Sequence, residues 1–162
     1  MSKEFTISRT VNAPRDLVWK AWSERDAFGQ WWGPKGCKLD VTKFEFRPGG
    51  MFHYGMKLPD GNVWWGRFVY REIVKPERIV FVNSFSDANG GVTRAPFSAT
   101  WPLEILNNLT LTESGGKTTL DLSGGPVNPS DEERAMFESM FGSMTQGFGG
   151  TLDQLEEFLA KA

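Results

Sequence analysis

The sequence predicts one α+β domain, in which a curved antiparallel sheet packs against a long C-terminal helix. A strand and two short helices come first, six segments of alternating apolar residues follow over 38–123, and an amphipathic stretch comes last. Consecutive strands joined by short turns form an antiparallel meander, and a helix has to cover its apolar face. With 162 residues and no repeat or linker-like stretch, the chain is expected to be a single domain over 1–162.

The N-terminal elements follow from periodicity and from helix-boundary residues. Residues 4–12 alternate apolar and polar side chains, which is typical of a strand. The Asn-Ala-Pro sequence at 12–14 supplies an N-cap and a proline suited to the first turn of a helix that runs to about Trp22. A second short helix begins after Ser23 and has to end before Gly33-Pro34, because proline disfavours a helical residue in front of it.

The rest of the chain supplies the meander and the final helix. Turn sequences rich in Gly, Pro, Asp and Asn separate the predicted strands. A capping-box pattern at Ser130 and Glu133 then begins an amphipathic helix, whose apolar residues recur every three or four positions from Phe137 to Leu159. The six predicted strands are 38–47, 51–57, 63–74, 78–86, 99–113 and 117–123.

Composition excludes several classes of partner and location. A net charge of −2 is unfavourable for a surface that binds phosphates, so nucleic acid is not expected as a partner. No apolar run approaches the roughly 20 residues of a membrane span, and the N-terminus does not resemble a signal peptide. The single cysteine, Cys37, cannot form an internal disulfide. We therefore expect a cytoplasmic protein without a membrane partner, either a monomer or a homodimer.

Aromatic residues are unusually frequent, with seven Trp, thirteen Phe and two Tyr. Large flat side chains around a gap between sheet and helix form either a dense core or the lining of a cavity. Strand parity directs several of them inward and places Asn83 and Asn107 among apolar neighbours, unless a bulge in 63–74 reverses the assignment. An unpaired buried amide costs about 1–3 kcal/mol, so each asparagine needs a protein partner, a water or a ligand.

No set of residues in the sequence is typical of a catalytic or metal site. His53 is the only histidine, and its parity places it on the face opposite Phe52 and Tyr54, which favours a structural role. Nucleophile-elbow, phosphate-loop and zinc-protease motifs are not found in the sequence. We predict no catalytic residue, metal ligand or cofactor. For Trp31 and Trp32 two interpretations stay open: either one indole plugs the open end of the core and the other lies on the surface, or the pair forms one wall of the cavity mouth.

The order of several segments resembles the START-like, or SRPBCC, superfamily. These segments are RTVNAPRDLVWKAWSERDAFGQWWGPKGC, FRPGGMF, YREIVKPERIVF, GGKTTLDL and GFGGTLDQLEEFLA. More narrowly they are similar to the branch named after the C-terminal domain of the activator of the ninety-kilodalton heat-shock protein ATPase, although Phe148 stands where tryptophan is expected. The resemblance implies a helix-grip fold with a cavity between sheet and helix. The expected lining comprises Trp32, Phe52, Tyr54, Met56, Trp64, Phe68, Asn83, Phe85, Asn107, Met144 and Phe148.

Three functions remain open at the level of sequence. The first is binding of a hydrophobic or aromatic small molecule, which would be wrong if the cavity volume were well below the roughly 300 Å³ typical of ligand pockets and side chains filled the space. The second, implied by the resemblance, is a chaperone-associated interaction domain of the stress response. The third is a cyclase- or hydrolase-like enzyme, for which changes at Tyr54, Asn83 or Asn107 would abolish activity rather than only weaken binding.

Overall fold

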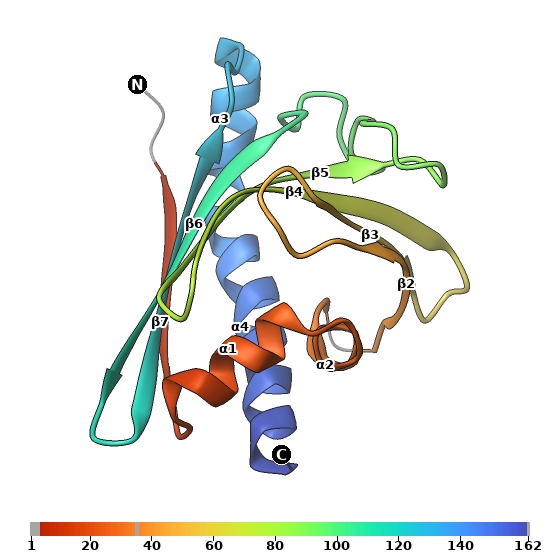
Figure 1. Ribbon diagram of the computed structural model, residues 1–162. Coiled ribbons are helices and arrows are strands. Elements are labelled where there is room, and N and C mark those ends of the chain that lie inside the picture. The colour runs from red at the N-terminus through yellow and green to blue at the C-terminus, as the bar shows by residue number, and fades with distance from the viewer. Residues whose placement is uncertain (1–3, 35, 162) are drawn as a thin grey trace.

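The protein is one seven-stranded antiparallel sheet with four helices, as a computed structural model covering residues 4–34 and 36–161 shows (Figure 1). The strand order is β1-β7-β6-β5-β4-β3-β2, so β1 and β2 form the two edges and the sheet does not close. The predicted α+β helix-grip architecture is confirmed. Its elements are β1 (Phe5–Val11), α1 (Arg15–Ser23), α2 (Arg25–Trp31), β2 (Lys38–Phe44), β3 (Met51–Lys57), β4 (Val63–Val74), β5 (Arg78–Ser86), β6 (Ile105–Ser114), β7 (Lys117–Pro126), α3 (Asp131–Ser139) and α4 (Phe141–Lys161).

The long helix α4 runs along the inner face of the curved sheet, with α1 and α2 beside its C-terminal half (Figure 1). Its buried residues include Leu152, Leu155 and Leu159. On β1, the Arg9 guanidinium donates hydrogen bonds to the carboxylates of Asp153 at 2.8 Å and Glu156 at 3.0 Å. These contacts attach α4 to an edge strand of the sheet.

Two predicted strands are too long. The strand predicted over 38–47 ends at Phe44, because residues 47–50 turn back toward β3 through a hydrogen bond from the Gly50 amide to the Arg47 carbonyl. The strand predicted over 99–113 begins only at Ile105. Pro102 has no amide hydrogen for a strand ladder, and Leu103 is 39% exposed.

The single C-terminal helix that the sequence predicts is divided into two helices, α3 and α4, in the structure. The capping box at Ser130 and Glu133 is confirmed and begins α3, which ends at Ser139. Met140 then leaves helical geometry, and α4 begins at Phe141. Gly147, Gly149 and Gly150 lie inside α4, which is continuous from Phe141 to Lys161.

Strand parity is correctly predicted where it matters for the interior. A β-bulge does occur in β4, between Tyr70 and Glu72, but it lies beyond the residues that face the candidate cavity. Phe52 on β3 therefore pairs with Phe68 on β4, and both point into the core. His53, on the opposite face, is buried by ring stacking on Trp65.

The space between sheet and helices has two parts. In the part covered by α1 and α2, which we call the packed half, rings fill the interior. Phe28, Trp31, Phe52 and Phe68 are each no more than 1% exposed. Phe68 stacks on Phe81 with ring centroids 4.2 Å apart. The part toward α3, which we call the hollow half, contains the candidate site.

Candidate functional site

Two adjoining chambers lie in the hollow half. The sheet chamber has a volume of about 170 Å³, and its wall is formed by Tyr54, Met56, Gly66, Asn83, Ser84, Phe85, Trp101, Ile105, Asn107, Met144 and Phe148. The helix chamber has a volume of about 210 Å³, and its wall is formed by Trp32, Gly33, Pro34, Tyr54, Met56, Met144, Gly147, Phe148 and Thr151. Four residues line both chambers, which places them side by side. Each volume is below the roughly 300 Å³ expected for the ligand cavity.

Eight of the eleven residues predicted to line a cavity do line these chambers. Trp32 belongs to the helix chamber alone. The sheet chamber brings together Tyr54, Met56, Asn83, Phe85, Asn107, Met144 and Phe148, which come from β3, β5, β6 and α4.

The other three predicted residues line neither chamber. Phe52 and Phe68 belong to the packed half, where they are 0% and 1% exposed. Trp64 packs edge-on against Phe85, with ring centroids 6.1 Å apart, and is tilted against Phe97, with ring centroids 6.2 Å apart. It therefore contacts a lining residue without lining a chamber itself. The sequence analysis assigned these side chains to the correct face of the sheet, but it did not predict how far along each strand the empty space begins.

Trp101 is a wall residue that the sequence analysis missed. It lies on the loop between β5 and β6, in a segment that was interpreted as strand. The Trp-Pro pair at 101–102 is a signal that could have marked this segment as a loop, because proline interrupts a strand ladder. Gly66 and Ile105, which parity places on the inner faces of their strands, and Ser84 also line the sheet chamber without having been among the predicted lining residues. The helix chamber adds Gly33, Pro34, Gly147 and Thr151.

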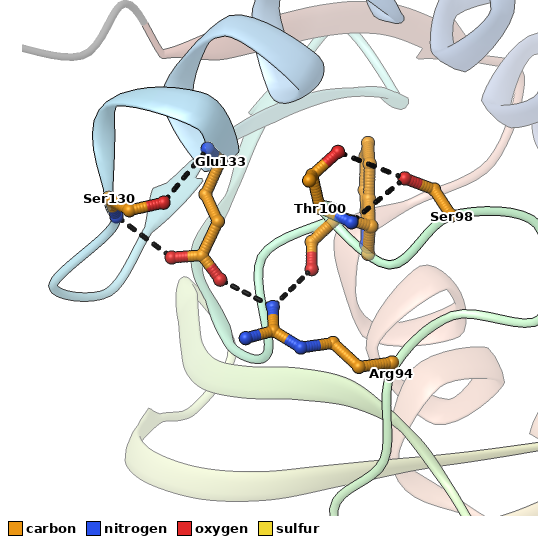
Figure 2. Close-up of polar contacts among 6 residues, drawn as sticks. Arg94, Ser98, Thr100, Ser130 and Glu133 are labelled. Atoms are coloured by element: carbon orange, nitrogen blue, oxygen red, sulfur yellow. Dashed lines mark hydrogen bonds and ion pairs between the residues drawn. The ribbon is translucent and has the colours of Figure 1, made fainter.

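Arg94 connects the Trp101 loop to the start of α3 (Figure 2). Its guanidinium donates to the Trp101 carbonyl at 3.0 Å and to the Glu133 carboxylate. Glu133 also accepts from the backbone amide of Ser130 in the capping box. The hydrogen bond from Arg94 holds the pKa of Glu133 below its ordinary value. One ion pair thus positions a wall of the sheet chamber against a helix terminus.

Tyr54 contributes a hydroxyl to both chambers. Its ring crosses Gly66, the residue directly opposite on β4, so closely that a Cβ there would lie 2.6 Å from the hydroxyl oxygen. Burial raises the pKa of Tyr54 to about 12, an effect that the neighbouring Trp32 side chain reduces only in part. The hydroxyl therefore stays protonated at neutral pH.

Asn83 and Asn107 form the polar part of the sheet chamber. The Asn107 amide nitrogen donates to the Asn83 side-chain oxygen at 2.7 Å and to the Ile105 carbonyl at 3.1 Å. Asn107 faces Gly124 on β7, where a Cβ would lie 2.6 Å from the Asn107 side-chain oxygen. Like Tyr54, this asparagine lies directly over a glycine, and a Cβ at that position would require a shift of its side chain.

Each of the two interpretations of the tryptophan pair holds for one of its members. Trp31 is buried in the packed half and donates from its indole to the Ala21 carbonyl at 3.0 Å. Trp32 is half-buried and forms a wall of the helix chamber.

The other candidates for chemistry lie away from the chambers. The His53 ring contacts the Thr42 hydroxyl and the Asp87 carbonyl on the outer side of the sheet. Burial, aided by Asp60, raises the pKa of the Cys37 thiol. Among residues 4–34 and 36–161, no three His, Cys, Asp or Glu side chains lie close enough together to hold a metal ion. None of the helices within those residues is long and apolar enough to cross a membrane.

The interior and the order of elements agree with a known family. The sequence model of the family described as activator of Hsp90 ATPase homolog 1-like protein matches residues 12–160. The chain belongs to this family. Comparison with curated protein sequences gives no match.

Solved structures of similar chains have the same fold. Protein Ms6760 from Mycobacterium smegmatis is 24% identical with a TM-score of 0.77, over 96% of this chain and 90% of that one. A protein from Arthrobacter aurescens is 23% identical with a TM-score of 0.81, over 98% of this chain and 87% of that one. DynU16, a protein of the dynemicin biosynthetic locus, is 19% identical with a TM-score of 0.66, over 99% of this chain and 48% of that one.

Proposed function

We propose that this protein binds a small, largely apolar molecule in the two adjoining chambers. The observation that carries the proposal is the hollow between sheet and α4, which is lined mainly by aromatic and methionine side chains. Ligand sites are concave and mostly apolar, with a few polar groups that fix orientation. Tyr54, Asn83 and Asn107 are such groups.

The volumes favour a ligand of one or two rings. An apolar protein cavity of about 150 Å³ holds benzene, and the sheet chamber is slightly larger at about 170 Å³. A ligand that extends past Tyr54, Met56, Met144 and Phe148 would enter the helix chamber as well. Methionine walls support this extension, because thioether side chains are flexible and adapt to irregular shapes.

A titration with indane, a two-ring hydrocarbon, tests the proposal. Binding is measured by the change in tryptophan fluorescence, since Trp32 and Trp101 line the chambers. Wild-type protein is expected to bind indane saturably, and the variant Met144→Phe, which fills the shared wall, is expected to lose most of this binding. Met140→Phe, at the junction of α3 and α4, is the matched control and keeps it. No saturable binding to the wild type would contradict the proposal.

Native mass spectrometry of freshly purified protein addresses the natural ligand. The proposal predicts an adduct of defined small mass, which should be missing from Met144→Phe and present on Met140→Phe. An adduct retained by both variants would place the bound molecule outside the chambers.

The family description supports a second candidate, an interaction with the chaperone Hsp90. This function would use the outer surface of the domain rather than the chambers. It predicts that the purified chain stimulates Hsp90 ATPase activity, and that Met144→Phe stimulates it as well as the wild type. No stimulation by the chain would contradict this candidate.

A further inference from the structure

Four polar residues line the sheet chamber, and one of them, Ser84, alternates with Asn83 and Phe85 along β5, so its side chain points to the other face of the sheet. The hydrogen bonds of the other three decide what kind of polar ligand group would fit. They are Tyr54 on β3, Asn83 on β5 and Asn107 on β6. A buried polar group of a ligand needs a complementary partner, because an unpaired one costs about 1–3 kcal/mol.

The Ile105 carbonyl fixes the orientation of both asparagine amides. A carbonyl oxygen only accepts hydrogen bonds, so the Asn107 atom that lies 3.1 Å from it has to be the amide nitrogen. The same nitrogen lies 2.7 Å from a terminal atom of the Asn83 side chain, which therefore has to be the oxygen. The remaining terminal atom of Asn83 is the NH₂ group.

The Asn83 NH₂ group is the donor left over by this network. It forms no hydrogen bond with any part of the chain that the structure describes, and Asn83 is half-buried in the wall of the sheet chamber. The Asn107 side-chain oxygen, by contrast, lies over Gly124 on β7, on the side away from Asn83. The amide pair thus presents a donor to the chamber through Asn83.

The Tyr54 hydroxyl is a second donor. A tyrosine hydroxyl carries one proton that it can donate, and its oxygen can accept as well. This hydroxyl and the Asn83 amide line the same chamber.

We infer that the ligand carries a hydrogen-bond acceptor, such as a ketone or ester carbonyl oxygen, that binds the Asn83 side-chain amide, with the Tyr54 hydroxyl as the second donor. The inference rests on the proposed function and adds the polarity of the ligand to it. A purely hydrocarbon ligand, or one whose polar group only donates, leaves the Asn83 amide unpaired.

Two matched probes separate the inference from the proposed function. Indane and 1-indanone share a two-ring skeleton and differ by one ketone oxygen. Each is titrated into the wild type and into Asn83→Leu, which keeps a side chain of similar shape without the donor. The variant is expected to bind 1-indanone about tenfold more weakly than the wild type does, whereas indane binding stays within about twofold or becomes tighter.

A second measurement uses only the wild type, so it holds even if Asn83→Leu fails to fold. In proton–nitrogen correlation spectra, 1-indanone is expected to move the Asn83 side-chain NH₂ signals to higher proton shift, as a new acceptor does, whereas indane is not. The Asn62 side-chain NH₂, which is bonded to Asp60 at the surface, is the internal control.

Each outcome supports or overturns a defined statement. Selective loss of 1-indanone affinity in Asn83→Leu, or the selective shift of the Asn83 signals, supports the inference. Equal weakening of both probes in the variant, or unmoved Asn83 signals at saturation with 1-indanone, overturns the inference and leaves the proposed function standing. Failure of the wild type to bind either probe overturns both.

Discussion

The packed half and the hollow half are built from the same strands, yet only one of them is filled. Along β3, Phe52 packs into the core, and two residues later Tyr54 faces a chamber. Along β4 the same step leads from Phe68 to Gly66, and along β5 it leads from Phe81 to Asn83. The inner face of the sheet continues from one half to the other, but on β4 and β5 a ring is replaced by a glycine or an amide, whereas β3 keeps a ring at Tyr54.

The elements that cover the two halves differ as well. Two short helices, α1 and α2, pack on α4 and place Phe28 and Trp31 in the interior of the packed half. The hollow half is covered by the loop that carries Trp101, which Arg94 and Glu133 hold in place (Figure 2). The hollow is therefore found where β4 and β5 carry Gly66 and Asn83 and where a loop, rather than α1 and α2, covers the sheet.

Truncation of one ring in each half is expected to give the largest difference in stability between the two halves. Phe68→Ala is expected to lower the free energy of unfolding by about 3–5 kcal/mol, because it creates a void in a filled core. Phe85→Ala, in the chamber wall, is expected to cost only about 1–2 kcal/mol, since its ring is half-buried and already borders empty space. Urea unfolding measures both. Equal losses would show that the two halves are packed alike.

Enlarging one α4 residue in the packed half and one in the hollow half tests whether the two halves tolerate added volume differently. Leu155→Phe is expected to cost about 1–3 kcal/mol, because Leu155 is fully buried in the packed half and an added ring overpacks it. Met144→Phe, three turns earlier on the same helix, is expected to cost less than about 1 kcal/mol, because the chambers can take up the added volume. Thermal and urea unfolding of both variants gives the difference. A larger loss for Met144→Phe would mean that the chambers are closed in solution.

A double-mutant cycle tests whether a glycine makes room for a polar wall residue. Gly124→Ala alone is expected to destabilise the protein by about 1–2 kcal/mol, since its Cβ would lie 2.6 Å from the Asn107 side-chain oxygen. In an Asn107→Ala background that contact is missing, and Gly124→Ala should then cost little. Additive effects in urea unfolding would mean that the close approach is relieved in some other way.

The ion pair that holds the Trp101 loop has the smallest expected effect on stability. Glu133→Gln is expected to lower the unfolding free energy at pH 7 by less than about 1 kcal/mol, because Arg94 is partly solvent-exposed. Arg94 lowers the pKa of folded Glu133. The contribution is therefore present above the unfolded value of about 4.3 and lost as the pH falls below it. Unfolding of the wild type and the variant at pH 7 and pH 3 checks this, and a difference that grows toward pH 3 would contradict it.

The sequence predicted which face of each strand lines the site better than it predicted where along the strand the chamber begins. Period-two alternation placed Tyr54, Asn83 and Asn107 on the inner face, because one face of each strand repeats every second residue. Alternation carries no information on how far along a strand the covering helices reach, so Phe52 and Phe68 were expected in the lining and lie in the core.

The loop wall was missed for a related reason. Residues 99–104 alternate well enough to resemble a strand. The Trp101 carbonyl instead accepts a hydrogen bond from Arg94, whose second partner, Glu133, lies 39 residues beyond Arg94 in the chain. The roles of Gly66 and Gly124 were equally out of reach, since each depends on which residue lies opposite in the neighbouring strand. Register is a property of the folded sheet.

The methionine methyl groups offer the most direct test that the hollow half is a binding chamber. Met56 and Met144 line both chambers, whereas Met136 and Met140 line neither. In a methyl carbon–proton spectrum of methionine-labelled protein titrated with 1-indanone, the Met56 and Met144 signals are expected to shift saturably while those of Met136 and Met140 stay in place. Unmoved Met56 and Met144 signals, or shifts of similar size at all four methionines, would contradict the account.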